Sequence, residues 1–261
     1  MKKVSLVLSI LLAFALFASC VTAEEAGPAL LAYFTFDDAE NLGADASGNG
    51  NDLVKAINPD GIKAVEGISG GAVYFSGSSG LVAYDDSNND FIDVYAQTGR
   101  DVTVSFYAKI DADNARFGGN SRAVDCGING SDEGFTILVN ANKAEDGTVS
   151  VFSISKVGGS DWWSSASAVE NDPEGWHHYV MVYDSENEKV VTFVDGIQIQ
   201  EVYADSEEKI AGSFTFCVGG NWAQWDWYNG GNHDVTMEGF IGAIDELKIY
   251  AGAVYDVDMF K

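Results

Sequence analysis

Beyond residue 29, short segments in which hydrophobic and polar residues alternate are separated by clusters of Gly, Asp, Asn and Ser. In the segment 102–108, for example, Val102, Val104 and Phe106 alternate with polar residues, which is the period of a half-buried strand. No part of this region shows the spacing of a long amphipathic helix. The pattern predicts strands over 30–36, 72–75, 81–84, 102–108, 122–128, 135–139, 149–154, 176–183, 190–194, 197–199, 214–218 and 239–250.

This succession of strands predicts an all-β fold, because strands and helices do not alternate as they would around a parallel sheet. Asp195-Gly196, between two strand patterns, is a strong signal for a tight hairpin. Each half-apolar sheet must bury one face, so we expect a two-sheet antiparallel jelly-roll sandwich. No linker or repeat divides it, and one domain is expected over 30–261.

The N-terminus is typical of an exported protein. Lys2 and Lys3 precede an apolar run over 4–18, which is too short to span a bilayer and fits a secretory leader. A lipobox-like sequence ends at Cys20, which would be lipidated, whereas Val21-Thr22-Ala23 offers small residues for cleavage by signal peptidase and release. Both routes stay open, and we favour the lipoprotein. The chain divides into a signal peptide at 1–23, a short tether at 24–29 and the domain at 30–261.

Charge narrows the set of partners. The sequence has 40 acidic and 14 basic residues, for a net charge of −26. Such a surface repels phosphates, so nucleic acid is excluded as a partner, and membrane contact is expected only through an N-terminal lipid. Cations and neutral ligands such as sugars remain compatible with it.

Two cysteines other than Cys20 are present, Cys126 and Cys217, both within predicted strands. In an oxidising compartment they could form a disulfide. The alternative is two separate buried thiols that behave as small hydrophobic residues.

Five blocks of sequence resemble, in order, the bacterial laminin-G-like jelly-roll family of concanavalin A-like lectin and glucanase domains. The blocks are Tyr33–Asp37 with Asp45–Asp52, Ala72–Gly77, Gly175–Tyr179, Phe193–Gly196 and Gly239–Tyr250, and Ala253–Asp258 takes the place of the family's C-terminal tail. The blocks span nearly the whole domain, so the resemblance implies the fold. It implies function only loosely, because this sandwich hosts lectin, adhesion and enzyme domains.

The opening loop has the composition of a calcium site. Asp45, Ser47 and Asn49 place oxygen-bearing side chains at alternate positions before Gly50, and calcium prefers oxygen ligands. The resemblance implies a structural Ca2+ where this loop meets the closing strand, with backbone carbonyls completing the shell. The residues that it implies as ligands are Asp37, Asp45, Asn49 and Asp245. The alternative is that these side chains only stabilise turns through local hydrogen bonds.

Two predicted loops, 221–234 and 160–165, combine aromatic residues with Asn, Asp, Gln, Gly and Ser. Aromatic rings can stack on the apolar face of a sugar while amides and carboxylates bind its hydroxyls. The alternative is that the rings cap the core beneath the loops. The candidate ligand-binding residues are Trp222, Trp225, Trp227, Tyr228, Trp162 and Trp163.

Catalysis is not expected. Glucanases of this family usually carry Glu-x-Asp-x-x-Glu on one strand, and the sequence lacks this motif. Asp245 and Glu246 are adjacent, so we expect their side chains to point to opposite faces of a strand. The sequence therefore predicts a non-catalytic carbohydrate-binding or adhesion module of the cell envelope or secretome, with a glycan or cell-surface polysaccharide as partner. The alternatives are a protein-binding or structural envelope lipoprotein and, less favoured, a glycoside hydrolase.

Overall fold

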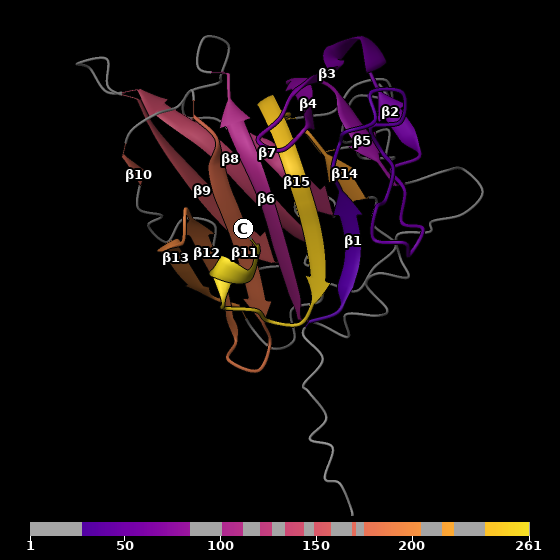
Figure 1. Cartoon of the computed structure of the whole chain (residues 1–261). Helices are drawn as coiled ribbons and strands as arrows, with labels where there is room; N and C mark the ends of the chain where they lie inside the picture. The colour runs from indigo at the N-terminus through magenta and orange to yellow at the C-terminus, as the bar shows by residue number, and fades with distance from the viewer. Residues whose placement is uncertain are drawn as a thin grey trace, which may run out of the picture.

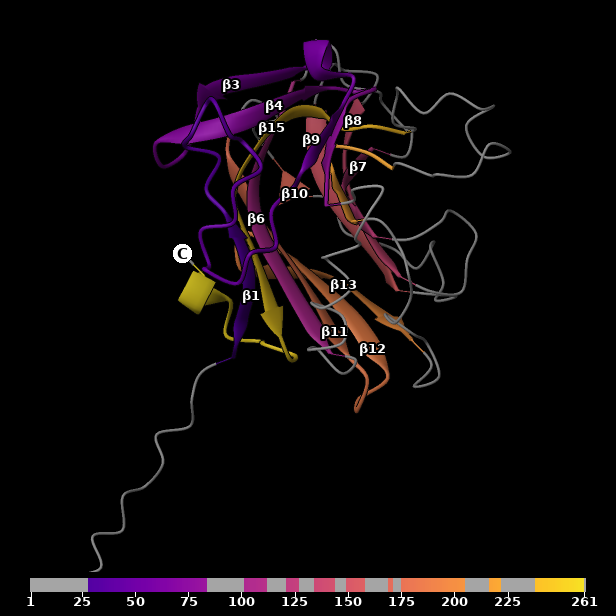
Figure 2. The ribbon, with the colours of Figure 1, turned by 90° about the vertical axis from the view of Figure 1, so that its right-hand side faces the viewer.

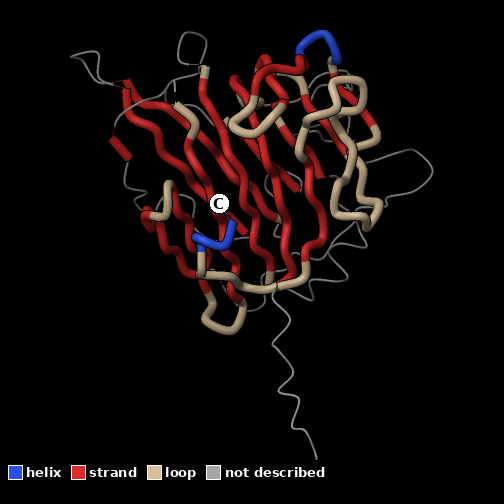
Figure 3. Tube along the Cα trace, viewed as in Figure 1, coloured by secondary structure: helices blue, strands red, loops and turns tan. Residues whose placement is uncertain are grey.

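The all-β prediction is confirmed by the computed structural model, in which two antiparallel sheets pack face to face (Figures 1 and 2). The residues that the structure describes are 28–83, 101–111, 121–126, 134–143, 149–157, 169–170, 175–204, 216–221 and 238–260. Within them, strands dominate and the helices are two short 3-10 turns, η1 (Pro59–Gly61) and η2 (Val257–Phe260), as Figure 3 shows. The predicted leader, including Cys20, lies outside these residues.

The first sheet has eight strands in the order β13-β12-β11-β6-β15-β4-β3, with β1 also paired to β15. Their bounds are β1 (Leu30–Phe34), β3 (Ile62–Glu66), β4 (Gly71–Ser76), β6 (Val102–Ile110), β11 (His177–Asp184), β12 (Lys189–Val194), β13 (Ile197–Tyr203) and β15 (Ile241–Ala251). The opening and closing strands thus lie side by side, as Figure 1 shows.

The second sheet has seven strands in the order β10-β9-β8-β7-β14-β5-β2. Their bounds are β2 (Lys55–Ile57), β5 (Gly80–Val82), β7 (Arg122–Cys126), β8 (Phe135–Lys143), β9 (Val149–Val157), β10 (Val169–Glu170) and β14 (Phe216–Val218). The strands β2, β3 and β10 were not predicted, because each is short or mostly exposed and lacks a clear apolar alternation.

The core lies between the sheets and is made by every second residue of the strands. Phe34, Phe75, Phe106 and Phe216 are all completely buried there. The Phe34 and Phe216 rings, from different sheets, stack with centroids 6.5 Å apart. These large rings join the two layers at the centre of the sandwich.

The hairpin predicted at Asp195-Gly196 is confirmed. It joins β12 to β13, and both residues have positive φ angles of 53° and 84°. Two consecutive left-handed residues are what a tight type I′ turn requires, and the Asp-Gly pair supplies them at low cost.

Cys126 and Cys217 are both buried and are not joined by a disulfide, so of the two alternatives the structure contains separate thiols. Their strands are neighbours, with Cys126 opposite Phe216 and Cys217 opposite Asp125. Adjacent positions point to opposite faces of a sheet. Cys126 accordingly lies in the main core, whereas Cys217 lies in a small cluster with Ile57 and Val82.

The expectation that Asp245 and Glu246 point to opposite faces is wrong. A bulge interrupts the register of β15 between Asp245 and Lys248, and Glu246 has a left-handed φ of 52°. The flanking Ile244 and Leu247 both face the core. The extra residue of the bulge therefore places both carboxylates on the outer face of the eight-stranded sheet.

The C-terminal segment covers part of this outer face. Helix η2 lies in front of β11 and β12 in Figure 1, and Phe260 packs against Val180, Val182, Val191 and Phe193. The tail thus covers apolar side chains that point away from the main core.

None of the helices among the described residues has the length and apolarity needed to cross a membrane.

Candidate functional site

The six aromatic residues proposed from sequence as the ligand site fall outside the described residues. They are Trp162, Trp163, Trp222, Trp225, Trp227 and Tyr228. The structure does describe the two points at which the loop 222–237 joins the sandwich, at Asn221 and at Glu238. These two junctions form the base of the loop, and the candidate site begins there.

The two ends of the loop are held against each other. The Phe240 N–H donates a hydrogen bond of 2.9 Å to the Gly219 carbonyl, and the Gly219 N–H donates one of 2.8 Å to Ala123. Gly239 lies so close to the Gly219 and Gly77 carbonyls that a Cβ atom would collide with the backbone. Glycine is therefore required there, and the loop leaves and re-enters the fold at one place.

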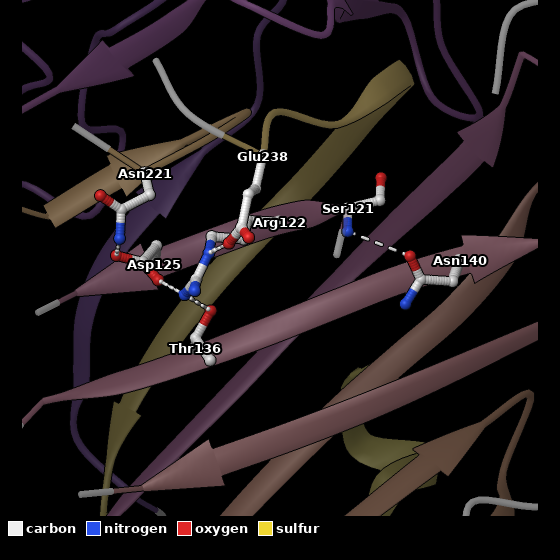
Figure 4. Close-up of polar contacts among 7 residues, drawn as sticks. All are labelled: Ser121, Arg122, Asp125, Thr136, Asn140, Asn221 and Glu238. Carbon is white, nitrogen blue, oxygen red and sulfur yellow. Dashed lines mark hydrogen bonds and ion pairs between the residues drawn. The ribbon is translucent and has the colours of Figure 1, made fainter. Parts of the chain in front are cut away.

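A buried ionic network lies at this base, as Figure 4 shows. Arg122 of β7 donates from Nη1 to Asp125 Oδ1 at 2.6 Å and to Thr136 Oγ1 at 3.0 Å, and from Nε to Glu238 Oε2 at 2.9 Å. Asn221 Nδ2 donates to Asp125 Oδ2 at 3.0 Å. One guanidinium thus connects the residue before the loop, through Asp125, with the residue after it.

The position of the network follows from strand alternation at Asp125 and from a bulge at Arg122. The pairing of β7 with β8 shifts between Arg122 and Val124, and both Ala123 and Val124 face the core, so Arg122 lies on the opposite face from them. Val124 and Cys126 face the core, so Asp125 between them points to the outer face of the seven-stranded sheet. Both Arg122 and Asp125 are only 2% exposed there. Burying either charge alone would cost free energy, and Arg122 and Asp125 each supply the opposite charge that the other needs.

Burial alone would lower the pKa of Arg122, but the carboxylates of Asp125 and Glu238 raise it, so the guanidinium stays charged. Burial raises the pKa of Asp125, and the neighbouring Arg122 opposes that shift. Removing one partner would leave the other charge buried and unpaired, which costs about 3–5 kcal/mol. The base of the loop is therefore a rigid part of the fold.

One polar atom at this base is unused. Asn221 is 1% exposed, and its Oδ1 accepts no hydrogen bond from the part of the chain that the structure describes. A buried acceptor of this kind normally has a partner, such as a water molecule or a ligand group. The sequence placed Asn221 in the aromatic loop but gave Arg122 and Asp125 no role. The available signal was two opposite charges within an otherwise apolar strand.

The predicted calcium ligands lie in two separate places. Asp45 accepts hydrogen bonds of 2.9 Å from the backbone N–H groups of Tyr33, Ser47 and Asn51. The Asn49 amide donates to the Leu30 and Leu31 carbonyls. Their contacts are those of the turn-stabilising alternative, because they hold the opening loop against β1.

Asp37 and Asp245 instead contact the loop 67–71. Asp37 Oδ1 accepts from the Gly71 N–H at 2.7 Å, and Asp245 Oδ2 accepts from the Ile68 N–H at 2.8 Å. A Cβ atom at Gly70 would collide with Asp37, and one at Gly67 would collide with Asp245. The carboxylates of Asp37 and Asp245 thus pack closely against the glycines of this loop, which we call the glycine cradle. Among the described residues no group of three His, Cys, Asp or Glu side chains could hold a metal ion, so a cation here would need backbone oxygens.

The two adjacent histidines have structural partners. His178 is buried, stacks on Tyr107 with ring centroids 4.7 Å apart, and shares a hydrogen bond of 2.8 Å with Ser105. His177 Nδ1 lies 2.7 Å from the Asp195 carboxylate at the hairpin. Both act within the sheet.

With the fold and these contacts established, the family can be assigned. Residues 77–256 match the model of Laminin_G_3, described as the concanavalin A-like lectin/glucanases superfamily. The chain belongs to this family. The match covers more than half of the chain and confirms the resemblance seen in the sequence blocks. No curated protein matches the chain.

Solved structures share the Laminin_G_3 fold at low sequence identity. Domain 4 of AbnA, an extracellular arabinanase from Geobacillus stearothermophilus in complex with arabinotriose, is 20% identical, with a TM-score of 0.52 over 87% of this chain and 94% of that domain. The binding domain of botulinum neurotoxin DC in complex with SialylT is 12% identical, with a TM-score of 0.50 over 88% of this chain and 50% of that one. The CBM40 domain of a Ruminococcus gnavus IT-sialidase, bound to α2,3-sialyllactose, is 14% identical, with a TM-score of 0.46 over 72% of this chain and 94% of that domain. The first two of these structures share the fold of this chain and were solved in complex with arabinotriose and with SialylT.

Proposed function

We propose that this protein is a non-catalytic carbohydrate-binding or adhesion module, exported to the bacterial envelope or secreted, which binds glycans through the loop 222–237. The observation that carries the proposal is the base of this loop. A segment rich in Trp, Asn, Asp and Gly begins and ends on one buried ionic network. Binding residues are commonly carried on loops that a rigid scaffold positions.

The comparisons support the ligand class. Domain 4 of the arabinanase, which aligns over most of both chains, is in complex with arabinotriose. Four aromatic residues in the loop, Trp222, Trp225, Trp227 and Tyr228, would stack on sugar rings, and Trp162 and Trp163 would add to the same surface.

The contacts of the two adjacent carboxylates, Asp245 and Glu246, argue against the hydrolase alternative. Asp245 is 0% exposed, and its oxygens accept hydrogen bonds from three backbone N–H groups. Glu246 accepts a hydrogen bond of 2.7 Å from the Tyr33 hydroxyl and pairs with Lys248 at 2.9 Å. A retaining glycosidase needs one carboxylate that can donate a proton and one that can attack the sugar. The contacts of Asp245 and Glu246 are instead structural, because they stabilise the bulge of β15.

Affinity electrophoresis against a panel of soluble neutral polysaccharides tests the proposal. Trp225→Ala combined with Trp227→Ala should weaken binding about 10- to 100-fold, because each lost ring contact is worth about 0.5–1.5 kcal/mol. Tyr203→Ala removes an aromatic residue that is 64% exposed on β13, in the other sheet from β14, after which the loop begins, and serves as the matched control. Binding that is unchanged in the double variant would rule out the loop as the site. A wild-type protein that retains no glycan but captures an envelope protein would favour the protein-binding alternative.

We also propose that a structural Ca2+ binds between Asp37 and Asp245, with backbone carbonyls of the loop 67–71 as further ligands. The glycine cradle supports this arrangement, and burial raises the pKa of Asp245 to about 6, so a nearby cation would relieve an unfavourable charge. Bound Ca2+ would lock the opening of the chain to its closing strand. Asp45 and Asn49 would support the neighbouring loop without binding the ion.

Thermal unfolding with Ca2+ and with chelator tests the calcium proposal. Calcium at 100 times its Kd should stabilise the wild type by about 2.7 kcal/mol, and Asp37→Asn should abolish the difference between the two conditions. Asp45→Asn should lower the Tm equally in both, since it weakens turn contacts alone. A wild-type Tm that does not respond to chelator would contradict calcium binding.

A further inference from the structure

A groove opens on the outer face of the eight-stranded sheet, where β3, β4, β15 and β6 run side by side. Its volume is about 590 Å3, within the usual range for small-ligand sites. The residues that give it its chemistry are Glu66, Tyr74, Lys109, Asp111, Trp176 and Ala243.

Strand register explains how the groove forms. Ala243 of β15 is opposite Tyr74 of β4 on one side and opposite Lys109 of β6 on the other. His177 is opposite Ala108, which places Trp176, one residue earlier, beside Lys109. Residues directly opposite one another point to the same face. These four side chains therefore form one row across the sheet, about 14 Å long at three inter-strand spacings.

A small residue between larger ones hollows the surface of this row. Ala243 and the adjoining Gly242 form a floor of small residues. The half-buried ring of Tyr74 rises on one side of this floor, and Lys109 followed by the half-buried ring of Trp176 lies on the other. The Tyr74 hydroxyl donates a hydrogen bond of 2.9 Å to Asp111 Oδ2, which fixes that ring. Burial, together with this carboxylate, raises the pKa of Tyr74 to about 12, so the hydroxyl stays protonated.

The charged groups around the groove indicate the class of ligand. Glu66 and Asp111 carry two negative charges and Lys109 carries one positive charge, on a chain whose net charge is −26. An anionic ligand would be repelled, whereas sugar hydroxyls can accept from an ammonium group and donate to carboxylates. Two aromatic rings, separated by the small floor and by Lys109, suit the flat faces of successive sugar rings.

We propose that this groove is a second saccharide site, which binds a short neutral oligosaccharide across β4, β15 and β6. Trp176 and Tyr74 stack on its rings, and Lys109, Asp111 and Glu66 hydrogen-bond its hydroxyls. The site goes beyond the loop proposed above as the glycan site. The loop begins at the network on the outer face of the seven-stranded sheet, whereas the groove lies on the outer face of the other sheet. The module would then engage two chains, or two parts of one chain, of a polysaccharide.

Nuclear magnetic resonance titration of the full mature protein tests the groove directly. The indole N–H signal of Trp176 is assigned by its loss in Trp176→Phe. Arabinotriose, xylotriose, cellotriose and mannotriose are the neutral probes, and trigalacturonate is the anionic one. The Trp176 signal is expected to shift with at least one neutral probe, and that probe should bind at least about 10-fold more tightly than the uronate.

Two variants and one control locate the binding. Trp176→Ala should weaken it at least about 10-fold, because the stacking face is lost. Ala243→Gln fills the floor at a position outside the core cluster between the sheets and should weaken binding equally, which decides the question if Trp176→Ala fails to fold. Ala64→Gln makes the same change on the exposed edge strand β3 and should leave binding unchanged. The loop double variant at Trp225 and Trp227 should also leave the Trp176 shift unchanged.

The outcomes separate the two sites. No shift of the Trp176 signal with any neutral probe, unchanged binding in Ala243→Gln, or tighter binding of the uronate would overturn the groove proposal. If, in that case, the loop double variant loses polysaccharide binding, the loop would still be supported as the glycan site. Conversely, loss in Ala243→Gln with no effect of the loop double variant would establish the groove and overturn the loop as the glycan site.

Discussion

The outer face of the eight-stranded sheet has two halves that the chain treats differently. Over β11 and β12, the outward side chains include Val182, Val191 and Phe193, and the C-terminal tail covers them. Over β4, β15 and β6, the outward side chains include Tyr74 and Lys109, and this half is hollowed into the groove. The two halves belong to one hydrogen-bonded antiparallel sheet.

The difference shows how the outward positions of a strand determine what covers a sheet. Valine and phenylalanine exposed to water cost about 25 cal/mol per Å2, so the covered half is stable only with the tail in place. Tyrosine and lysine keep polar tips that water solvates, so the other half can stay open. The chain supplies its own cover for the apolar half and leaves the aromatic, polar half available to a ligand.

Removing the contact of the C-terminal tail with the covered half should change stability more than any other substitution proposed here. Phe260 is 2% exposed and its ring lies 5.0 Å from that of Tyr250, so Phe260→Ala should destabilise the fold by about 3 kcal/mol. Urea denaturation measures the change. Met259→Ala, at a neighbour that is 44% exposed, should cost less than about 0.5 kcal/mol. Equal effects of the two substitutions would show that the tail does not hold the covered half.

One substitution made in both halves sharpens the comparison. Val191→Ser removes apolar atoms from a completely buried outward position and leaves a hydroxyl beneath the tail, which should cost about 2 kcal/mol. Lys109→Ser, on the exposed surface of the open half, should change the free energy of unfolding by less than about 0.5 kcal/mol. A Lys109→Ser variant as unstable as Val191→Ser would mean that the groove is part of the folded core.

Much of this architecture was readable from the sequence, and the reasons are local. The alternation in 102–108 and the Asp195-Gly196 turn each depend on neighbouring residues, and both are confirmed. Ala253–Asp258 was placed as the family's tail, but what it covers depends on Val182 and Val191, which are distant in sequence. The covered half could not have been predicted without the register of β11 and β12.

The candidate site was less predictable because it depends on exceptions to alternation. The bulge at Glu246 places the carboxylates of Asp245 and Glu246 on one face. A left-handed conformation at glutamate cannot be predicted from residue preferences. The link from Arg122 to Glu238 joins positions far apart in sequence, as does the row from Tyr74 to Trp176. Composition alone indicated the aromatic loop, and the groove required both the register and the small residue at 243.

The smallest predicted effect concerns how the tail is fastened to the covered half. The Tyr255 hydroxyl donates a hydrogen bond of 2.7 Å to Asp184 Oδ2 at the end of β11. Although burial raises it, the pKa of Asp184 is held below its usual value by the hydrogen bonds from Tyr255 and Asn187 and by the charge of Lys189. Tyr255→Phe should cost about 0.5–1 kcal/mol at neutral pH, since the pair is partly exposed.

The pH dependence distinguishes this bond from simple packing. A carboxyl with a lowered pKa in the folded state contributes stability above its unfolded pKa of about 3.9 and loses that contribution as the pH falls through the folded value. The difference between wild type and Tyr255→Phe should therefore be constant from about pH 7 to 5 and shrink toward pH 3. In an Asp184→Asn background, the same substitution should show no such dependence. A difference that stays constant down to pH 3 in both backgrounds would show that packing of the tail, and not its bond to Asp184, stabilises the covered half.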